Sequence, residues 1–78
     1  MTIEIGKLYS CLHYRRAIFD SEYRSSYLGE LAENSLFVVL KAKKVNSRDI
    51  FCLKILTSSG IVGWIHIHPV NVKVENQC

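Results

Sequence analysis

The segment at residues 57–65 constrains the fold of this chain more than any other, because it combines a polar turn, two glycines and a tryptophan. It reads TSSGIVGWI. Serines and a glycine ahead of an apolar run are typical of a tight turn that leads into a strand. Glycine inside a strand usually marks a bulge, a sharp bend or a close approach of another backbone, so we expect one of these at Gly63. Together these features favour a small β-barrel.

The length of the chain allows one domain. Its 78 residues leave room for a single compact core and exclude a second one. Hydrophobic residues make up 49% of the chain and charged residues 22%, which is not the composition of a disordered segment. The formal net charge of +3 is too small to indicate nucleic-acid binding unless the basic residues gather in a patch. We therefore expect one folded domain over residues 1–78.

The cysteines and the first residues bear on the cellular compartment. Cys11, Cys52 and Cys78 form an odd set without a CxxC pair, which favours reduced thiols over a disulfide scaffold. Cys52 lies between Phe51 and Leu53 in an apolar run, so we expect it in the core. The chain does not open with a charged segment followed by an apolar one, and no apolar run has the length of a membrane span. These features predict a cytoplasmic protein.

Alternating apolar residues predict five short strands. We expect them at residues 7–12, 36–44, 50–56 and 61–67, with a last strand around Val70, Val72 and Val74. Residues 13–30 are polar and hold several aromatics, and they have room for an irregular hairpin of their own. A segment of this length between strands tends to be functional. Five short strands with small turns describe a closed or nearly closed barrel, which removes exposed sheet edges.

The predicted strand at residues 36–44 has the clearest alternation. One of its faces carries the aliphatic side chains of Leu36, Val38, Leu40 and Ala42. Lys41 and Lys43 lie on the other face. We therefore expect the aliphatic face to be buried and the lysines to reach solvent. A polar connection at residues 45–49 links this strand to the next one in a hairpin.

Three segments carry a resemblance to a known family. Residues 28–40 read LGELAENSLFVVL, residues 60–65 read GIVGWI and residues 69–72 read PVNV. In this order they resemble the diverging turn, the glycine-apolar segment after the distal hairpin, and the short turn before the last strand of the Src-homology-3 barrel, including its bacterial relatives. The resemblance covers most of the chain and implies a single five-stranded Src-homology-3-like barrel with a long loop after the first strand. Similar strands and glycine turns recur in Tudor-like, Sm-like and oligonucleotide-binding barrels.

The resemblance also implies a groove for an extended peptide. Peptide-binding members of the family use aromatics and a proline to bind proline-rich ligands. Tyr9, Pro69 and Asn71 match such groove positions in this chain. The chain departs from the family where it has DIF at residues 49–51 in place of a tryptophan, and Val72 in place of a tyrosine.

Aromatic residues and one proline are the candidate ligand-binding positions. We assign this role to Tyr9, Tyr14, Tyr23, Tyr27, Trp64 and Pro69. On its strand, Trp64 shares one face with His66 and His68, while Ile65 and Ile67 share the other. Isoleucines that point inward would turn the indole outward as a ligand platform. The alternative is that Trp64 packs in the core.

Basic residues offer an alternative, nucleic-acid-binding surface. Arginines and lysines would contact phosphates while tyrosines of the long loop stack on bases. The basic residues concerned are Arg15, Arg16, Arg24, Lys41, Lys43 and Lys44, with Arg48 as an extension. Asp20, Glu22 and Glu30 interrupt the positive charge of the loop, so ordinary solubility is the competing explanation for these residues.

Patterns for metal binding and catalysis are weak. His66 and His68, with Cys11 and His13, supply nitrogen and sulfur donors that suit zinc. Neither pair has a recognised metal spacing, so we expect no metal and no cofactor. The sequence holds no nucleophile elbow, no paired carboxylates and no phosphate-binding glycine loop.

These patterns predict a non-enzymatic binding module. Its expected partner is a protein or peptide, in an interaction or assembly role that uses the long loop and the surroundings of Trp64 and Pro69. Nucleic acid is the alternative partner, and no membrane partner is expected. Self-association into a homo-oligomer through an exposed apolar face is a third alternative. A small barrel without a catalytic motif is compatible with a bacterial or phage origin.

Overall fold

The computed structural model describes residues 3–45 and 49–75, which form β-strands and one short 3-10 helix. In chain order the elements are β1 (Leu8–Cys11), β2 (Arg16–Phe19), β3 (Tyr27–Leu31), β4 (Leu36–Val45), β5 (Ile50–Thr57), β6 (Val62–Ile67), the 3-10 helix η1 (Pro69–Asn71) and β7 (Val72–Val74). Arg48 and Cys78 lie outside the described residues. Among the described residues, no helical segment is long and apolar enough to cross a bilayer.

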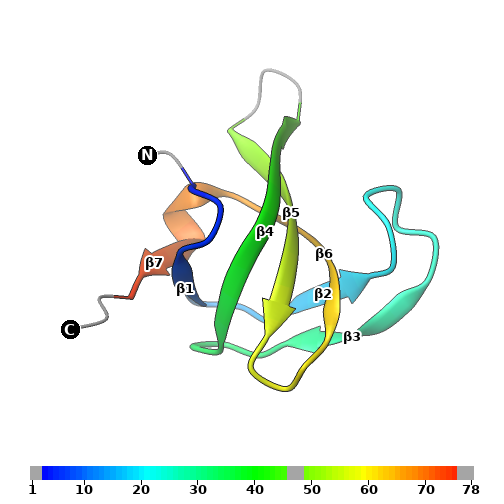
Figure 1. Cartoon of the computed structure of the whole chain (residues 1–78), viewed down its shortest axis with the longest axis horizontal. Helices are drawn as coiled ribbons and strands as arrows, with labels where there is room; N and C mark the ends of the chain where they lie inside the picture. Colours follow the sequence, from blue (N-terminus) through cyan, green and yellow to red (C-terminus); the bar gives the residue numbers. More distant parts are fainter. Residues whose placement is uncertain (1–2, 46–48, 76–78) are drawn as a thin grey trace.

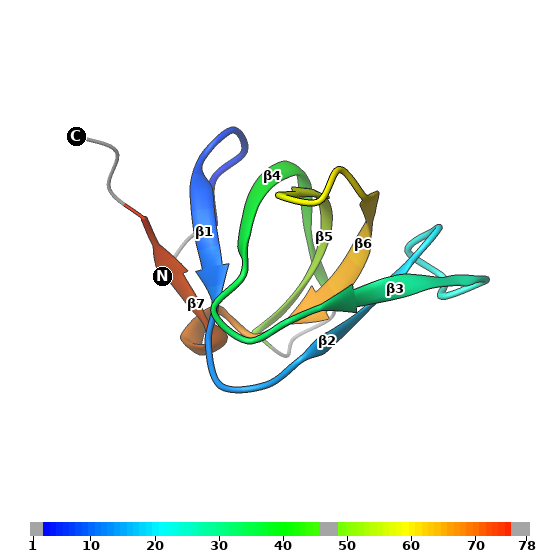
Figure 2. The same ribbon diagram turned by 90° about the horizontal axis from the view of Figure 1, so that it is seen from below.

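The strands form one antiparallel sheet in the order β3-β2-β6-β5-β4-β1-β7 (Figure 1). The sheet is strongly curved in the view from below (Figure 2). Every strand contributes at least one side chain to a single buried cluster, so the sheet wraps around one core. β3 and β7 are the two edges, and the hydrogen-bonded sheet is not closed. The all-β prediction is confirmed, whereas the prediction of five strands is wrong because the described chain forms seven.

The two additional strands lie in the long polar segment. β2 and β3 pair antiparallel, with Ile18 opposite Gly29, and their register shifts between Ile18 and Phe19. This is the irregular hairpin for which the segment had room. The predicted strands at residues 7–12, 36–44, 50–56 and 61–67 correspond to β1, β4, β5 and β6.

The last strand is shorter than the valine alternation predicts. Pro69 opens η1, and Nδ1 of His68 accepts a hydrogen bond from the backbone N–H of Val70 at 3.1 Å. Proline fixes its φ and lacks a donor, which favours a helical turn over a ladder at this point. Val70 is therefore part of η1 and 65% exposed, and β7 begins only at Val72.

β4 turns a different set of residues toward the core than its alternation predicts. Phe37 and Val39 are 1% and 0% exposed, whereas Leu36 and Leu40 are 40% and 37% exposed. The register of the β4–β5 pair shifts between Val39 and Lys41, so the alternation is interrupted there by a bulge. Leu40 and Lys41 are consequently both exposed. The lysines reach solvent as predicted, and Ala42 packs against the core beyond the bulge, but Leu36 and Leu40 are exposed.

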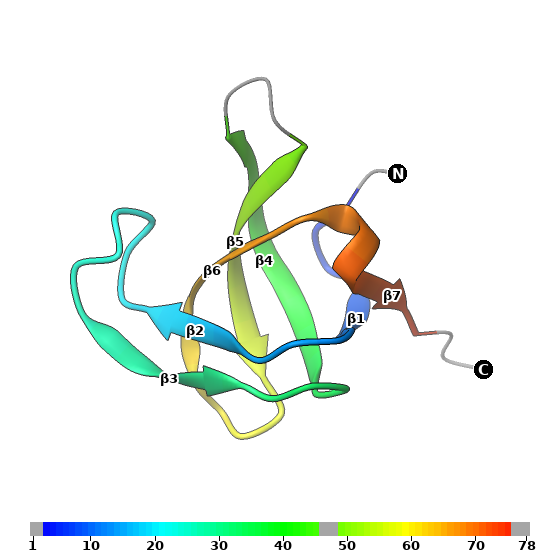
Figure 3. The ribbon, with the colours of Figure 1, turned by 180° about the vertical axis from the view of Figure 1, so that it is seen from behind.

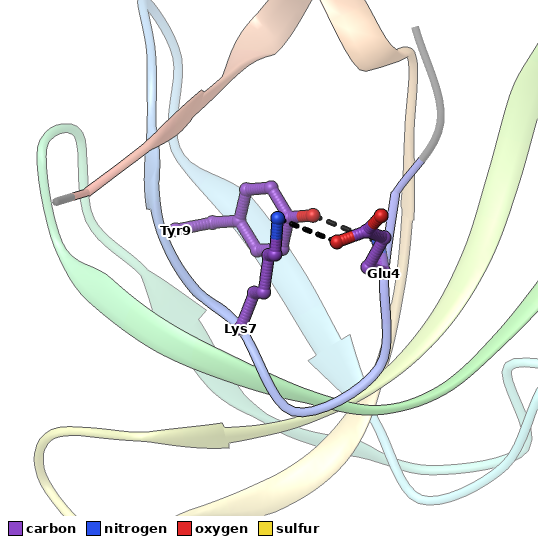
Figure 4. Close-up of polar contacts among 3 residues, drawn as sticks. All are labelled: Glu4, Lys7 and Tyr9. Atoms are coloured by element: carbon purple, nitrogen blue, oxygen red, sulfur yellow. Dashed lines mark hydrogen bonds and ion pairs between the residues drawn. The ribbon is translucent and has the colours of Figure 1, made fainter.

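Tyr9 on β1 is a core residue whose hydroxyl group has a partner. Its side chain is 1% exposed, and its ring stacks on Phe37 with the ring centroids 6.1 Å apart. The hydroxyl oxygen accepts a hydrogen bond from the backbone N–H of Glu4 at 2.8 Å, and Glu4 also pairs with Lys7 (Figure 4). A buried phenol needs such a partner. Tyr9 thus fastens the segment before β1 to the core.

Gly63 on β6 permits the close crossing of β2. These strands pair through Phe19 and Trp64. A Cβ atom on Gly63 would lie 2.4 Å from Cγ2 of Ile18 and 2.8 Å from the carbonyl oxygen of Phe19, distances that no side chain tolerates. Gly60 has a different role, because its φ of +90° serves the turn before β6 and no atom lies within 4 Å of a Cβ there. Of the three features expected at Gly63, a bulge, a sharp bend or a close backbone approach, the structure shows the close approach.

We expect Gly63→Ala to lower the free energy of unfolding by about 1–3 kcal/mol, because the added methyl group collides with β2. Chemical denaturation followed by tryptophan fluorescence measures this change. Gly60→Ala is the matched control, since it costs about 1 kcal/mol for its left-handed backbone without touching β2. Backbone NMR signals of β2 should therefore shift in Gly63→Ala and stay in place in Gly60→Ala. Unchanged stability and unchanged β2 signals in Gly63→Ala would contradict the close approach.

Candidate functional site

The loop at residues 20–26, between β2 and β3, is held in shape by its own hydrogen bonds. The Asp20 N–H donates to the carbonyl oxygen of Ser26, and the Ser26 N–H donates to Asp20 Oδ1, both at 2.9 Å. Ser21 accepts from the Tyr23 N–H with its Oγ at 3.2 Å and from the Arg24 N–H with its carbonyl oxygen at 3.1 Å. Arg24 has a φ of 59°, which turns the chain back toward the sheet. Serine and aspartate favour such local bonds.

Two side-chain contacts connect this loop to the sheet. The Nε–H of Arg24 donates to Nδ1 of His66 on β6 at 3.1 Å. Oε1 of Glu22 lies 3.5 Å from Nζ of Lys43 on β4. The view from behind shows the β2–β3 hairpin crossing in front of β6 (Figure 3). The loop therefore spans the sheet from β6 to β4.

Cys52 is buried among the hydrophobic residues as predicted, although it lies apart from the main cluster. It is 2% exposed and does not belong to the buried cluster that the sheet encloses. Its register partners are Lys43 and His66, which contact the loop. Burial raises the pKa of the Cys52 thiol, and the nearby Glu22 raises it further. The loop thus shields a neutral thiol on the outer face of the sheet.

Two depressions adjoin at His66. The first has a volume of about 290 Å³, and its walls include Glu22, Tyr23, Lys43, Lys44, Cys52 and His66. The second has a volume of about 260 Å³ and is lined by Arg15, Arg16, Ala17, Phe19, Arg24 and His66. We use the term cationic surface for the five basic residues around these depressions, Arg15, Arg16, Arg24, Lys43 and Lys44.

Ion pairs offset part of the charge of the cationic surface. The pairs, with their nitrogen–oxygen distances, are Arg15 with Glu30 at 3.5 Å, Lys43 with Glu22 at 3.5 Å and Lys44 with Asp49 at 3.3 Å. The pairs of Arg15 with Glu30 and of Lys44 with Asp49 join largely exposed side chains, so each contributes only about 0–1 kcal/mol and an anionic ligand can displace them. Glu22 is more buried than the other two carboxylates. Arg16 and Arg24 have no carboxylate oxygen within 4.0 Å in the described part of the chain.

Arg16 has a donor that its surroundings do not satisfy. Its Nε is buried and has no hydrogen-bond acceptor among the described residues. A buried donor without an acceptor costs about 1–3 kcal/mol. The side chain also lies near Cys11, where burial raises the pKa of the thiol and the positive charge of Arg16 opposes that effect. Arg16 therefore reaches the Cys11 thiol, and its Nε–H lacks an acceptor with hydrogen-bond geometry.

His66 accepts its hydrogen bond from Arg24 as a neutral imidazole. Burial lowers the pKa of His66, and the positive charge of Arg24 lowers it further, while Glu22 acts in the opposite direction. A protonated imidazole has no lone pair at Nδ1, so it could not accept from Arg24. Protonation of His66 and docking of the loop are therefore opposed.

We expect the contribution of His66 to stability to depend on pH. Because its pKa in the folded protein lies below the ordinary histidine value of 6.5, the unfolded chain takes up the proton first as the pH falls. The stabilisation is complete above about pH 6.5 and is lost as the pH falls toward the folded-state pKa. Arg24→Ala removes the neighbouring charge and should raise the pKa of His66, which NMR titration of its Cε1–H signal measures. Lys73→Ala, which removes an exposed charge on β7, is the control, and an unchanged His66 pKa in Arg24→Ala would refute this coupling.

The tyrosines of the long segment are exposed, and one of them borders the depressions. Tyr14, Tyr23 and Tyr27 are 69%, 82% and 59% exposed. Tyr23 forms part of the wall of the first depression. Tyr27 packs edge-on against Phe19, with ring centroids 6.2 Å apart, and Tyr14 lies beside His13. Tyr23 is thus the tyrosine best placed to contact a ligand at the cationic surface.

Trp64 faces outward, as the inward isoleucine arrangement predicts. Ile65 and Ile67 are 0% and 1% exposed, while Trp64 is half-buried. The register partners of Trp64 are Lys54 on β5 and Phe19 on β2. The indole therefore lies beside the second depression, on the same strand face as His66, without lining either depression.

Two of the candidate ligand-binding residues are buried. Tyr9 lies in the core, and Pro69 is the buried first residue of η1. Neither presents a ring to solvent. The residues of that set with exposed or half-buried side chains are Tyr14, Tyr23, Tyr27 and Trp64.

The structure brings basic residues from two separate segments to one surface. The first segment supplies the three arginines, and β4 supplies Lys43 and Lys44. Lys41 comes earlier in β4 than Lys43 and Lys44, pairs in register with Lys54, and lines neither depression. Patterns in the sequence did not predict that His66 and Phe19 lie at this surface. The contact of His66 with Arg24 spans 42 positions of the chain, so no local signal points to it.

Three of the four candidate zinc donors make hydrogen bonds elsewhere, and the fourth, His13, lies beside Tyr14. Sγ of Cys11 donates to the carbonyl oxygen of Tyr14 at 3.2 Å, and Nδ1 of His68 caps η1. His66 accepts from Arg24. Residues 3–45 and 49–75 contain no group of three or more histidine, cysteine or acidic side chains placed to hold a metal ion.

A second exposed surface is aliphatic. Leu8, Val38, Leu56 and Val62 occupy successive register positions on β1, β4, β5 and β6, and we call them the aliphatic row. Leu56 and Val62 are 39% and 47% exposed. A depression of about 170 Å³ lies at this row and includes Leu36 in its walls. Self-association through an apolar face stays a prediction, which sedimentation at several protein concentrations tests.

Comparison with known proteins gives no relative for this chain. No family model, curated protein or solved structure matches it. The chemistry of the site therefore has to be argued from its own geometry, above all from the two depressions that meet at His66.

Proposed function

We propose that this chain is a non-enzymatic binding module that holds an acidic segment of a protein partner on the cationic surface. The observation that carries the proposal is the meeting of two depressions at His66, with five basic side chains around them. Their combined volume is large enough for a few side chains of a partner. Tyr23 adds an exposed aromatic ring at the rim of the first depression.

Charge distribution favours a protein partner over a continuous polyanion. Five basic residues form the surface, and three carboxylates pair with three of them. A short acidic segment can meet the basic residues between these carboxylates, whereas a long phosphate backbone would also pass the carboxylates and be repelled there. Arginine and tyrosine are also enriched at protein interfaces.

The non-enzymatic part of the proposal rests on the state of the nucleophiles. Cys11 and Cys52 are both buried, and burial raises the pKa of each thiol. A thiol is a weak nucleophile until it becomes a thiolate. His66, the register partner of Cys52, accepts its hydrogen bond from Arg24. This arrangement suits binding better than covalent chemistry.

The finer part of the fold prediction belongs to this proposal. We propose that the curved sheet is a divergent Src-homology-3-like barrel in which the long segment after β1 carries the binding loop. Support comes from the order of elements, with the β2–β3 hairpin after the first strand and η1 immediately before the last. The matching segments of the sequence at residues 28–40, 60–65 and 69–72 point the same way.

Binding of a labelled glutamate-rich peptide tests the proposed function. We expect saturable binding at low ionic strength and a loss of about tenfold or more in affinity for Arg24→Ala, since a hydrogen bond to a charged group contributes about 1.5–3 kcal/mol. Fluorescence anisotropy measures both. Lys73→Ala removes the same charge from exposed β7 and should leave the affinity unchanged. Absence of binding, or equal losses in the two variants, would count against the cationic surface.

Nucleic acid remains the second candidate because basic residues from both predicted segments share one surface with Tyr23. In that case binding of a single-stranded oligonucleotide should fall with salt, with a slope of log K against log salt near −3.5 for about five phosphates. Titrations at several salt concentrations measure the slope. Tighter binding of the oligonucleotide than of the acidic peptide, with such a slope, would replace the protein partner by nucleic acid. No oligonucleotide binding at low salt would eliminate this candidate.

A further inference from the structure

The second depression differs from the first in the charge of its walls. Arg15, Arg16 and Arg24 line it, and no acidic residue does. The first depression, in contrast, has Glu22 in its wall. Glu30 pairs with Arg15 next to this depression, but Arg16 and Arg24 have no carboxylate partner among the described residues. The second depression is thus the more positive part of the cationic surface, and it suits a group with two negative charges.

From this contrast we infer that the second depression is a subsite for a phosphoryl group, the phosphomonoester of a phosphorylated side chain on the partner. The inference rests on the proposed function and names the anionic group that the acidic segment places here. Guanidinium groups form paired, charge-assisted hydrogen bonds with phosphate oxygens. A phosphomonoester offers three acceptor oxygens and a charge of about −1.5 to −2 at neutral pH, which three arginines match better than one carboxylate does.

Arg16 brings a positive charge to the second depression, and no carboxylate oxygen lies within 4.0 Å of it among the described residues. Its Nε is closed to solvent, so an oxyanion in the depression would bond to the terminal nitrogens of the guanidinium. Two donors on one planar group match two oxygens of a phosphate. Arg16 therefore favours an oxyanion at this place.

Arg24 is held ready for the same ligand. His66 accepts from its Nε at 3.1 Å, which fixes the plane of the guanidinium and leaves the terminal nitrogens of the fork as donors. A side chain that is oriented before binding loses less entropy when the ligand arrives. Arg24 lacks a carboxylate partner within 4.0 Å among the described residues, so no internal ion pair has to break.

The remaining walls suit the size and the attachment of such a group. The volume of about 260 Å³ compares with about 30 Å³ for one water molecule in the liquid, so a phosphoryl group with its ester oxygen and part of its hydration fits. Phe19 and Ala17 supply apolar walls beside the arginines. Such walls can pack against the carbon atoms that join the phosphate to the partner chain.

NMR titration with small anions tests the inference. The probes are phenyl phosphate, dimethyl phosphate and acetate, at about pH 8 and constant ionic strength, where the monoester is a dianion because its second pKa is about 6. We expect phenyl phosphate to bind at least about tenfold more tightly than acetate or dimethyl phosphate, a difference of about 1.4 kcal/mol. The Nε–Hε signals of Arg16 and Arg24 and the amide signals of β2 should shift on saturation.

Three variants give the test its controls. Arg16→Lys keeps the charge but removes the planar pair of terminal donors, and we expect it to lose the preference for phenyl phosphate. Arg15→Ala alters a side chain that is 77% exposed, so it should weaken phenyl phosphate binding without disturbing the fold. Lys73→Ala should leave all affinities unchanged. Backbone spectra of each variant show whether it is folded.

The outcomes separate this inference from the proposed function. Equal affinities for phenyl phosphate and acetate would overturn the phosphoryl subsite, even if the glutamate-rich peptide still binds. Dimethyl phosphate binding as tightly as phenyl phosphate would also overturn it, and would indicate the phosphodiester backbone of a nucleic acid instead. Tight phenyl phosphate binding that Arg16→Lys and Arg15→Ala do not weaken would place the anion elsewhere and refute the assignment.

Discussion

The position of the candidate site depends on the crossing of β2 over β6 at Gly63. Space for this crossing exists only because Gly63 has no side chain, since a Cβ there would lie 2.8 Å from the backbone oxygen of Phe19. The crossing sets where the loop at residues 20–26 leaves the sheet. It also brings the arginines of this segment next to β6, where Arg24 meets His66. Gly63, which has no side chain, therefore determines which charged groups become neighbours.

The contact between Arg24 and His66 then divides the outer surface into its two depressions. A neutral His66 keeps Arg24 in place, and a positive φ at Arg24 directs its side chain back to the sheet. Opening of the loop would expose the buried thiol of Cys52 and would remove one wall from each depression. Loop position, thiol shielding and the shape of the surface are therefore linked through one hydrogen bond.

Local patterns in the sequence predicted where the strands lie. They predicted less well which side chains each strand buries and which distant residues it meets. Apolar alternation and the turn residues predicted β1, β4, β5 and β6, and the glycine rule predicted the close approach at Gly63. Alternation failed in β4, because the bulge near Leu40 shifts the pattern and a bulge depends on the partner strand. The cationic surface could be predicted only as two basic segments. Its assembly depends on the contact of Arg24 with His66, and no periodic signal encodes a contact across 42 positions.

Side chains on the outer face of the sheet follow an order that separates two kinds of surface. Along β6, Val62 belongs to the aliphatic row, Trp64 comes next and His66 borders the depressions. Alternate residues of a strand are about 6.6 Å apart, so the aliphatic row and His66 are separated by roughly 13 Å. An anion held by the arginines would therefore leave the aliphatic row uncovered. Trp64 is half-buried and lies between the aliphatic row and the cationic surface. A ligand large enough to touch both surfaces would therefore have to cover Trp64.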